Sequence, residues 1–237
     1  MSIVGLLLIL VAMLAILTVP MYKYKKEDEK DANSDALYAK LYDSIYMDNG
    51  RFEREMRLLS TPEGSYVLDV GCGTGDRVGW VAHAVGVDKS PHMVAVAKKK
   101  YPKKTFVEGD VLKKGTFKAE TFTEVWCLGN SLYCLPEKMR FLQNAHRWLD
   151  ASGTLVLELM DRLRFCVPSP YPKNFYYDLK RMGNTCRERV KFKKERAVVE
   201  TTYYPISSTR MLDMAERVGF KLERKAGNFT FFRKAPF

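Results

Sequence analysis

Hydrophobic and polar positions divide the chain into a continuous apolar run and a longer part in which two periods alternate. The run Ile3–Tyr22 contains no charged residue, and its length matches the ~20 residues that a membrane-spanning helix requires. Three of the next four residues are lysines, which favours a cytoplasmic location for the chain that follows. We therefore expect a single-pass membrane anchor in residues 1–22 and a polar linker in residues 23–35.

A cleaved signal peptide and a buried helix are the alternative interpretations of the apolar run. A signal peptide carries Lys or Arg before the run and small residues at a cleavage site after it. Here only the N-terminal amine precedes the run, and no such cleavage site follows. The pattern therefore favours an anchor that is retained.

Between residues 65 and 160, short β-branched segments alternate with segments whose apolar residues recur at helical spacing. Strands that alternate with helices in this way form a parallel sheet with helices on both faces. We therefore expect an α/β fold with a doubly wound, mostly parallel sheet. The expected strands are 65–70, 84–88, 104–110, 121–129 and 153–160, and the expected helices between them are 76–84, 90–100 and 136–150.

The segments on either side of this alternation have different patterns. Apolar residues before it recur at helical spacing with a break at Asn49-Gly50, which predicts two helices. The chain after it departs from the alternation, and we expect residues 162–207 to be inserted as a cap over a ligand crevice. The elements expected there are two antiparallel strands in 187–205, a capped helix in 207–220 and a closing hairpin in 221–235.

Charge changes this picture, because the formal net charge of +11 is concentrated in part of the predicted cap. Residues 180–196 contain eight Lys and Arg against two Glu. A solvated hairpin face is one interpretation, and contact with an anionic lipid surface is another. Aromatic residues interleave with the cations and could stack on bases. No nucleic-acid-binding motif accompanies them, so we rank a lipid surface or a small molecule above nucleic acid.

The five cysteines favour a reducing environment. They are odd in number, scattered along the chain and never spaced as C-x-x-C. This pattern is typical of reduced thiols facing the cytosol rather than of a disulfide framework or a zinc site. We expect no metal site.

Candidate chemistry is concentrated at the ends of the first three predicted strands. In VLDVGCGTGD, Asp69 precedes three glycines that allow the backbone to turn tightly and approach a ligand. The spacing is G-x-G-x-G and differs from the G-x-G-x-x-G of dinucleotide binders. Asp88 ends the second strand, where a carboxylate can accept both hydroxyls of a ribose, and Asp110 ends the third. Together they predict a pocket for a nucleoside that also bears a cation.

The set VLDVGCGTG, GVD and GDV closely resembles class I S-adenosylmethionine-dependent methyltransferases over about residues 36–237. The resemblance implies a Rossmann-like sheet of seven strands with a reversed last strand, and S-adenosylmethionine as cofactor. It also implies which residues hold the cofactor. They are Asp69, Gly71, Gly73 and Gly75 in the loop, Asp88 at the ribose, and Asp110 with Val111 at the adenine.

A narrower resemblance links two further segments to glycine N-methyltransferase-like enzymes, which methylate small molecules. The segment WCLGNSLYCLP is similar to their fourth-strand region, and YAKLYDSIY is similar to an N-terminal helix whose tyrosines close over the cofactor. This implies Tyr38, Tyr42, Asn130 and Ser131 as pocket residues. Plain core packing is the alternative for the two tyrosines, which lie four residues apart.

Methyl transfer from a sulfonium needs alignment and exclusion of water more than acid–base catalysis. The three histidines fall in predicted helices or a helix N-terminus, so we expect them to be structural or solvated. Asn130, Glu158 and Asp161 are the catalytic candidates, and the two carboxylates could orient a cationic or hydroxyl-bearing acceptor. A salt bridge to the cap is the alternative for both.

The sequence thus predicts a membrane-anchored methyltransferase that acts on the nitrogen or oxygen of a small molecule or lipid. Its catalytic domain, residues 36–237, would face the cytoplasm. An inactive cofactor-binding scaffold and an RNA, DNA or protein methyltransferase remain as alternatives.

Overall fold

The computed structural model describes residues 34–160, 175–192 and 197–235. The predicted anchor and nearly all of the predicted linker lie outside these residues. Within the described ranges, no helix has the length and apolar character needed to cross a membrane.

Seven strands form the central sheet, in the order β3-β2-β1-β4-β5-β10-β9. Neighbouring strands from β3 to β5 pair in parallel, whereas β10 runs antiparallel to both of its neighbours. The expected mostly parallel seven-stranded sheet with a reversed last strand is therefore confirmed. Its strands are β1 (Val67–Val70), β2 (Ala84–Asp88), β3 (Thr105–Glu108), β4 (Phe122–Cys127), β5 (Leu149–Glu158), β9 (Phe220–Ala226) and β10 (Phe229–Lys234).

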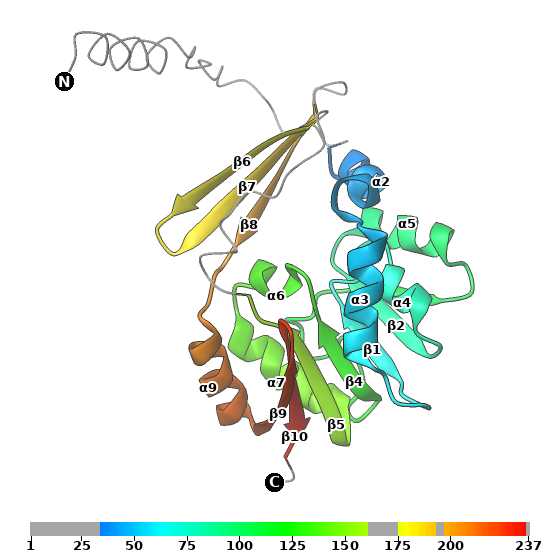
Figure 1. Cartoon of the computed structure of the whole chain (residues 1–237), viewed down its shortest axis with the longest axis vertical. Coiled ribbons are helices and arrows are strands. Elements are labelled where there is room, and N and C mark those ends of the chain that lie inside the picture. Colours follow the sequence, from blue (N-terminus) through cyan, green and yellow to red (C-terminus); the bar gives the residue numbers. More distant parts are fainter. Residues whose placement is uncertain (1–33, 161–174, 193–196, 236–237) are drawn as a thin grey trace, which may run out of the picture.

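Helices cover both faces of this sheet (Figure 1) because its inner strands bury successive side chains on opposite sides. Leu68 belongs to the core cluster that includes residues of α7 and α9, whereas the preceding Val67 belongs to the cluster that includes residues of α3, α4 and α5. The described helices are α2 (Ser34–Tyr46), α3 (Asn49–Leu59), α4 (Asp76–Trp80), α5 (Pro91–Lys100), α6 (Ser131–Cys134), α7 (Lys138–Trp148) and α9 (Ser208–Val218).

The helices predicted for 90–100, 136–150 and 207–220 are observed with ends shifted by at most two residues, and two further helix boundaries differ in ways that change the local structure. The break before α3 falls at Met47 and Asp48, because the Asp48 side chain accepts a hydrogen bond from the Arg51 N–H and caps the helix. The helix predicted for 76–84 ends at Trp80. His83 therefore lies in an exposed bend before β2 rather than in a helix.

The predicted cap is a three-stranded antiparallel sheet, which we call the cap sheet: β6 (Phe175–Met182), β7 (Thr185–Phe192) and β8 (Ala197–Tyr203). The two strands expected in 187–205 are β7 and β8, whereas β6 was not predicted. Figure 1 shows the cap sheet beside α2, beyond the end of the central sheet at which α6 lies. Leu37, Leu41 and Ile45 of α2 pack against the buried residues of the cap sheet, so the helix joins the cap to the body of the molecule.

A buried lysine fixes the chain where it leaves the cap sheet. Lys138, at the start of α7, donates hydrogen bonds to the carbonyls of Leu135 and Tyr204, both at 2.7 Å. The Tyr204 N–H in turn donates to the Tyr133 carbonyl at 2.7 Å. Burial lowers the pKa of Lys138 to about 8. These bonds join the residue that follows β8 to α6 and so fix the cap sheet to the body of the molecule.

Candidate functional site

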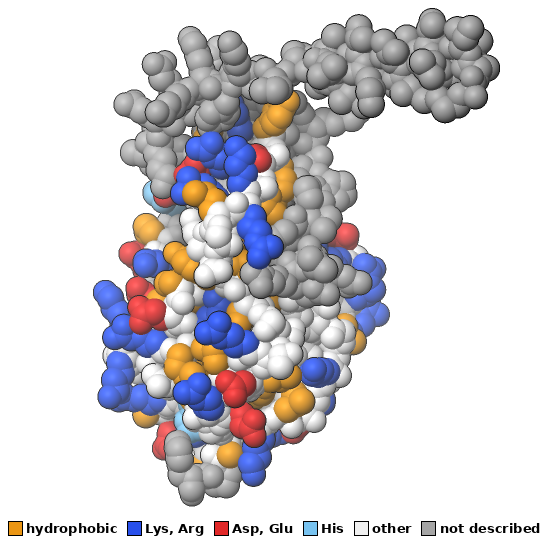
Figure 2. Space-filling model, turned by 90° about the vertical axis from the view of Figure 1, so that its left-hand side faces the viewer, with side chains coloured by type: hydrophobic (Ala, Val, Ile, Leu, Met, Phe, Trp, Pro, Cys, Tyr) orange, Lys and Arg blue, Asp and Glu red, His pale blue; other side chains and the backbone are white. Residues whose placement is uncertain are grey.

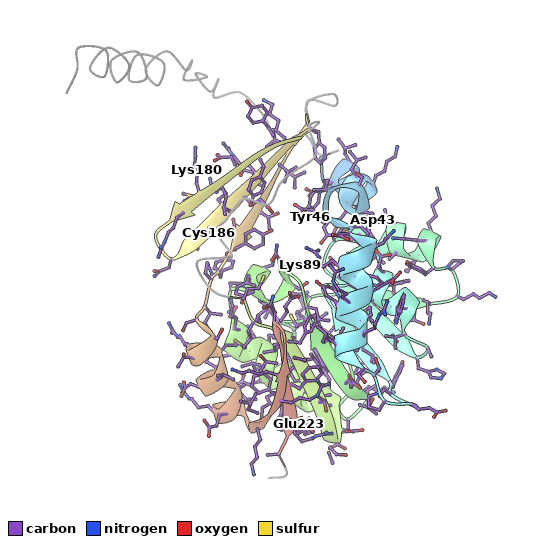
Figure 3. The ribbon with its side chains drawn as sticks, in the orientation of Figure 1. Asp43, Tyr46, Lys89, Lys180, Cys186 and Glu223 are labelled. Atoms are coloured by element: carbon purple, nitrogen blue, oxygen red, sulfur yellow. The ribbon has the colours of Figure 1, made fainter. Side chains whose placement is uncertain are left out.

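A cavity of about 660 Å³ lies where β1, β2, β4 and β5 end, beneath α2 and the cap sheet. Its volume falls in the range of small-molecule pockets, ~300–1,000 Å³. Figure 3 shows Tyr46 and Lys89 in the space between the cap sheet and helices α2 and α3. The ends of parallel strands on either side of the switch in strand order are the usual ligand site of a doubly wound sheet. Position and size therefore make this cavity the candidate active site.

The glycine loop after β1 forms the floor of the cavity. Gly71 has φ +69°, and a Cβ at this position would lie 2.4 Å from the Ser131 Oγ. That hydroxyl donates to the Gly71 carbonyl at 3.2 Å. The Gly73 N–H, at φ +54°, donates to the Asp88 Oδ2 at 2.9 Å. The loop therefore needs glycine both for its conformation and for its close contact with α6.

Gly75 does not line the cavity, although the sequence placed it in the cofactor site. It precedes α4 with φ +88°, and a Cβ there would lie 2.7 Å from the Phe106 ring. Its contribution is to bring the start of α4 close to β3 and α5. The third glycine of the motif is thus required by packing behind the loop.

Asp69 and Arg77 place opposite charges beside the loop. Asp69 is 2% exposed, and its Oδ2 has no hydrogen-bond partner among the described residues. Burial raises the pKa of this carboxyl to about 6, and Arg77 opposes the shift. Arg77 lines the cavity with its Nη2 3.6 Å from Glu55 Oε2, while its buried Nε has no partner within the described ranges. A carboxylate and a guanidinium beside the same loop suit a ligand that carries both an ammonium and a carboxylate.

Asp88 holds two turns together at the end of β2. Its Oδ1 accepts the Ser90 N–H and its Oδ2 accepts the Gly73 N–H, each at 2.9 Å. Burial raises its pKa, and these backbone bonds oppose that shift. Ser90, rather than Asp88, caps α5 by accepting the Met93 N–H. Each carboxylate oxygen has a second lone pair, so Asp88 can still accept hydrogen bonds from a ligand in the cavity.

Asp110 and Val111 form the next part of the wall. The Asp110 Oδ1 accepts the Leu112 N–H at 2.9 Å, and this bond, more than the nearby Lys89, lowers the pKa of the carboxyl. The Val111 carbonyl accepts a hydrogen bond from the buried Asn144 of α7 at 2.8 Å. Sequence analysis missed Asn144, because only the tertiary structure brings α7 beneath this loop.

Helix α2 closes one side of the cavity and is tied to the sheet by charge. Lys100 of α5 lies 2.6 Å from both Asp43 of α2 and Asp76 of α4. Thr74 of the glycine loop donates to Asp43 as well. This network was not predicted, and it fixes the helix directly over the loop.

The tyrosines of α2 face the same cavity. Tyr38, Tyr42 and Tyr46 all line it, at the four-residue spacing that places side chains on one helix face. Tyr42 also lies against the loop, since a Cβ on Gly73 would be 3.8 Å from its ring. The two tyrosines proposed from sequence therefore line the pocket, and Tyr46, missed there, continues the row.

The catalytic candidates differ in their placement. Asn130 and Glu158 line the cavity, as does the pocket candidate Ser131, and the Glu158 Oε2 accepts the Gly129 N–H at 2.6 Å. Asp161 lies outside the described residues. Together with the loop, Asp88, Asp110 and Val111, these side chains surround a single pocket, and Asp69 lies buried beside it.

Residues 68–157 match the family described as "Methyltransferase domain". The chain is 29% identical over 102 residues to the trans-aconitate 2-methyltransferase of Escherichia coli O1:K1 / APEC. That match spans 40% of this chain and only 39% of the relative's length. The family match covers the part of the chain that carries β1 to β5, and the chain spans well under half the length of this relative.

Solved structures show the same fold over most of the chain. The CcbJ methyltransferase of Streptomyces caelestis is 15% identical with a TM-score of 0.65, covering 88% of this chain and 100% of that one. CalS10 of Micromonospora echinaspora, an amino pentose methyltransferase in a structure with bound S-adenosylmethionine, is 18% identical with a TM-score of 0.55. The match covers 90% of this chain and 100% of the CalS10 chain.

Proposed function

We propose that this chain, which carries a class I S-adenosylmethionine-dependent methyltransferase domain, transfers the methyl group of that cofactor to a small molecule. The observation that carries the proposal is the single cavity, which joins the family's cofactor residues to a further compartment under the cap sheet. Bound S-adenosylmethionine supplies an electrophilic methyl group on a sulfonium. The protein must therefore bind two partners, align them and exclude water.

The residues of the cavity fit this cofactor. The negative charge of Asp69, buried beside the loop, and the guanidinium of Arg77, which lines the cavity, suit the ammonium and the carboxylate of its methionine portion. Asp88 would accept the ribose hydroxyls, and Asp110 with Val111 would flank the adenine. The absence of a Cβ at Gly73 leaves space between the loop and Tyr42. The residues proposed to hold the cofactor thus lie at the ends of β1, β2 and β3.

The acceptor would occupy the remainder of the cavity, between the end of β5 and the cap sheet. Glu158 and Asn130 line it from below, and α2 with the cap sheet lies above. Glu158 is held by the Gly129 N–H, so its carboxylate has a fixed position relative to the cofactor site. We assign Glu158 the task of orienting the acceptor, with α2 and the cap excluding water.

We also propose that residues 3–22 anchor the protein in a membrane with the domain on the cytoplasmic side. The apolar run and the lysines that follow it support this proposal. The pairing of β6, β7 and β8 puts Lys180, Arg187, Arg189 and Lys191 on one face of the cap sheet, opposite the face that bears Cys186 and Glu188. Figure 2 shows Lys and Arg side chains on the surface of the cap, and a basic surface near an anionic leaflet adds up to ~1 kcal/mol per residue.

Loss of the Asp88 carboxylate should reduce transfer at subsaturating cofactor by weakening cofactor binding. One lost charged hydrogen bond costs ~1.5–3 kcal/mol, so Asp88→Ala should reduce S-adenosylmethionine affinity roughly tenfold or more. The assay incubates full-length protein with methyl-labelled cofactor and a whole-cell extract and measures where the label is found. We expect the label in the small-molecule or lipid fraction. Calorimetric titration and a melting curve separate lost affinity from lost stability.

Glu108→Ala is the matched control for Asp88→Ala. Glu108 pairs with Asp88 across β2 and β3 but is exposed and lies outside the cavity lining. Its loss should leave both cofactor affinity and label transfer unchanged. Cofactor binding without any transfer, or label confined to nucleic acid or protein, would contradict the proposed function.

Cofactor affinity should fall as the pH is lowered through about 6. Burial has raised the Asp69 pKa to about 6, so below this pH the free protein carries a neutral carboxyl that cannot attract an ammonium. Binding of a cation favours the ionised form, and affinity should therefore decline by up to ~tenfold per pH unit below 6. Titration calorimetry between pH 5 and 7 measures this decline, and Asp69→Asn should flatten the profile. A wild-type affinity that is constant over this range, or higher at pH 5, would show that Asp69 does not face the cofactor.

Deleting residues 1–21 should convert a carbonate-resistant membrane protein into a soluble one that still binds cofactor. The deleted run precedes the predicted linker and lies outside the described residues, whose elements begin at Ser34. Sedimentation after carbonate extraction and cofactor titration measure the two properties. Extraction of the full-length protein by carbonate would contradict the proposed anchor. A truncated protein that no longer folds would show that the domain needs residues 1–21 for its stability.

A further inference from the structure

We propose that the acceptor is an amine that enters the cavity as a cation and is recognised by the tyrosines of α2 and by Tyr203 and Glu188 of the cap sheet. This inference rests on the proposed methyl transfer and specifies its acceptor. The observations that carry it are the composition of the cap's inner face, the row of tyrosines opposite it, and the sign of the charge around the cavity.

The pairing of the cap sheet determines which residues face the cavity. In β7 the residues from Thr185 to Phe192 alternate between partly buried and buried, and Glu188 is on the buried side at 3% exposure. Thr201 lies opposite Glu188 in β8, and Tyr203 is two residues further along the same face. All three line the cavity. A carboxylate therefore stands on the inner face of a strand whose other buried side chains include Val190 and Phe192.

Glu188 is built into this wall rather than placed there by a flexible side chain. The Tyr203 hydroxyl, 5% exposed as a residue, donates to the Glu188 Oε2 at 2.6 Å. Burying a carboxylate is unfavourable unless its charge is compensated by hydrogen bonds or by a cation. The Tyr203 hydroxyl provides one such bond, and a cationic ligand in the cavity would be attracted to the same carboxylate.

The tyrosines of α2 form an aromatic wall facing the cap. The ring centroids of Tyr38 and Tyr42 are 5.6 Å apart and those of Tyr42 and Tyr46 are 4.8 Å apart. The Tyr38 and Tyr46 hydroxyls lie 3.2 Å apart, which fixes the row. Each of these tyrosines is half-buried and keeps surface in the cavity. Tyrosine faces attract ammonium groups, most strongly where water is excluded.

Glu188 and these tyrosines line the same cavity, so the carboxylate charge acts on their hydroxyls. Burial raises the pKa of Tyr42 to about 12, and the Glu188 charge contributes in the same direction. The pKa of Tyr46 is raised for the same two reasons. The tyrosines consequently stay neutral, and the carboxylate supplies the negative charge of the pocket.

The cavity as a whole is acidic although the chain is basic. Among the described residues that line it, ten are Asp or Glu and only Arg51, Arg77 and Lys89 are cationic. Three of the ten also have cationic partners outside the lining, since Lys100 pairs with Asp43 and Asp76 and Arg189 pairs with Glu200. Acidic residues remain in excess. Arg77 lies beside Glu55 and Lys89 beside Asp110, in the cofactor half. A polycarboxylate acceptor would therefore be repelled by Glu158 and Glu188, whereas a protonated amine would be attracted.

The chemistry that follows is balanced in atoms and charge. The bound ammonium first releases one proton to a cavity carboxylate or to water, which gives a neutral amine with a nitrogen lone pair. That pair forms the N–C bond to the methyl group while the S–C bond breaks and its electrons remain on sulfur. The products are a methylated ammonium and a neutral thioether, so the positive charge passes from the cofactor to the product.

Binding and transfer should both select amines over compounds of the same shape and different charge. The probes are 2-phenylethylamine, cyclohexylamine and glucosamine, each compared with its matching alcohol and carboxylate, and trans-aconitate as a polycarboxylate. At least one amine should raise the melting temperature of the full-length protein saturated with S-adenosylhomocysteine. The carboxylates should leave that melting temperature unchanged. Labelled S-adenosylmethionine should then transfer its methyl group to the same amine.

Glu188→Gln keeps the shape of the side chain and removes its charge. We expect amine affinity to fall at least tenfold and cofactor affinity to stay unchanged. Asp178→Asn is the matched control, because Asp178 lies on the outer face of the same sheet beside Lys180. If the Glu188 variant does not fold, Tyr46→Leu should weaken amine binding and Tyr46→Phe should preserve it.

The outcomes separate this inference from the proposed function. A protein that fails to bind S-adenosylmethionine contradicts the proposed function itself. Cofactor binding with transfer to alcohols or carboxylates leaves that function standing and overturns the amine acceptor. Cofactor binding with no stabilisation by any amine, or a Glu188→Gln variant with unchanged amine affinity, also overturns it.

Discussion

The two hydrogen bonds accepted by Asp88 are the constraint on which the site depends. One carboxylate fixes the Gly73 N–H of the loop after β1 and the Ser90 N–H at the start of α5, each at 2.9 Å. The loop can follow this path only because Gly71 and Gly73 adopt positive φ. Its position in turn leaves Asp69 buried beside the cavity and brings Thr74 to Asp43 of α2. The floor, one wall and the lid of the cavity are thus coupled through a single side chain.

A second level of organisation comes from the elements that cover the pocket. Helix α2 packs its apolar residues on the cap sheet, is tied to α4 and α5 through Lys100, and turns its tyrosines to the cavity. The exit of β8 is joined to α6 through Lys138 and Tyr204. Because both covering elements are fixed to the cofactor half, we expect binding of the cofactor and closure of the acceptor compartment to be coupled.

Much of the central sheet could be predicted from the sequence because its inner strands are buried on both faces and read as continuous apolar runs. The strand 84–88 was predicted with its observed bounds. Strand β6 was missed because Asp178, Lys180 and Arg181 interrupt its apolar pattern, and only pairing with β7 explains it. Motif spacing predicted Asp69 and Asp88 as cofactor-binding residues, but could not show that Gly75 packs against Phe106. Arg77 and Asn144 gain their roles from partners that the fold brings together, which no local pattern reveals.

The central claim is that α2 and the glycine loop enclose the cofactor at the ends of β1 and β2. Hydrogen exchange of the full-length protein with and without S-adenosylmethionine tests it most directly. The account predicts slower exchange on cofactor binding in residues 34–46 and 71–77, where amides lie in α2, in the loop and at the start of α4. Slower exchange confined to other parts of the chain, with these two segments unchanged, would contradict it.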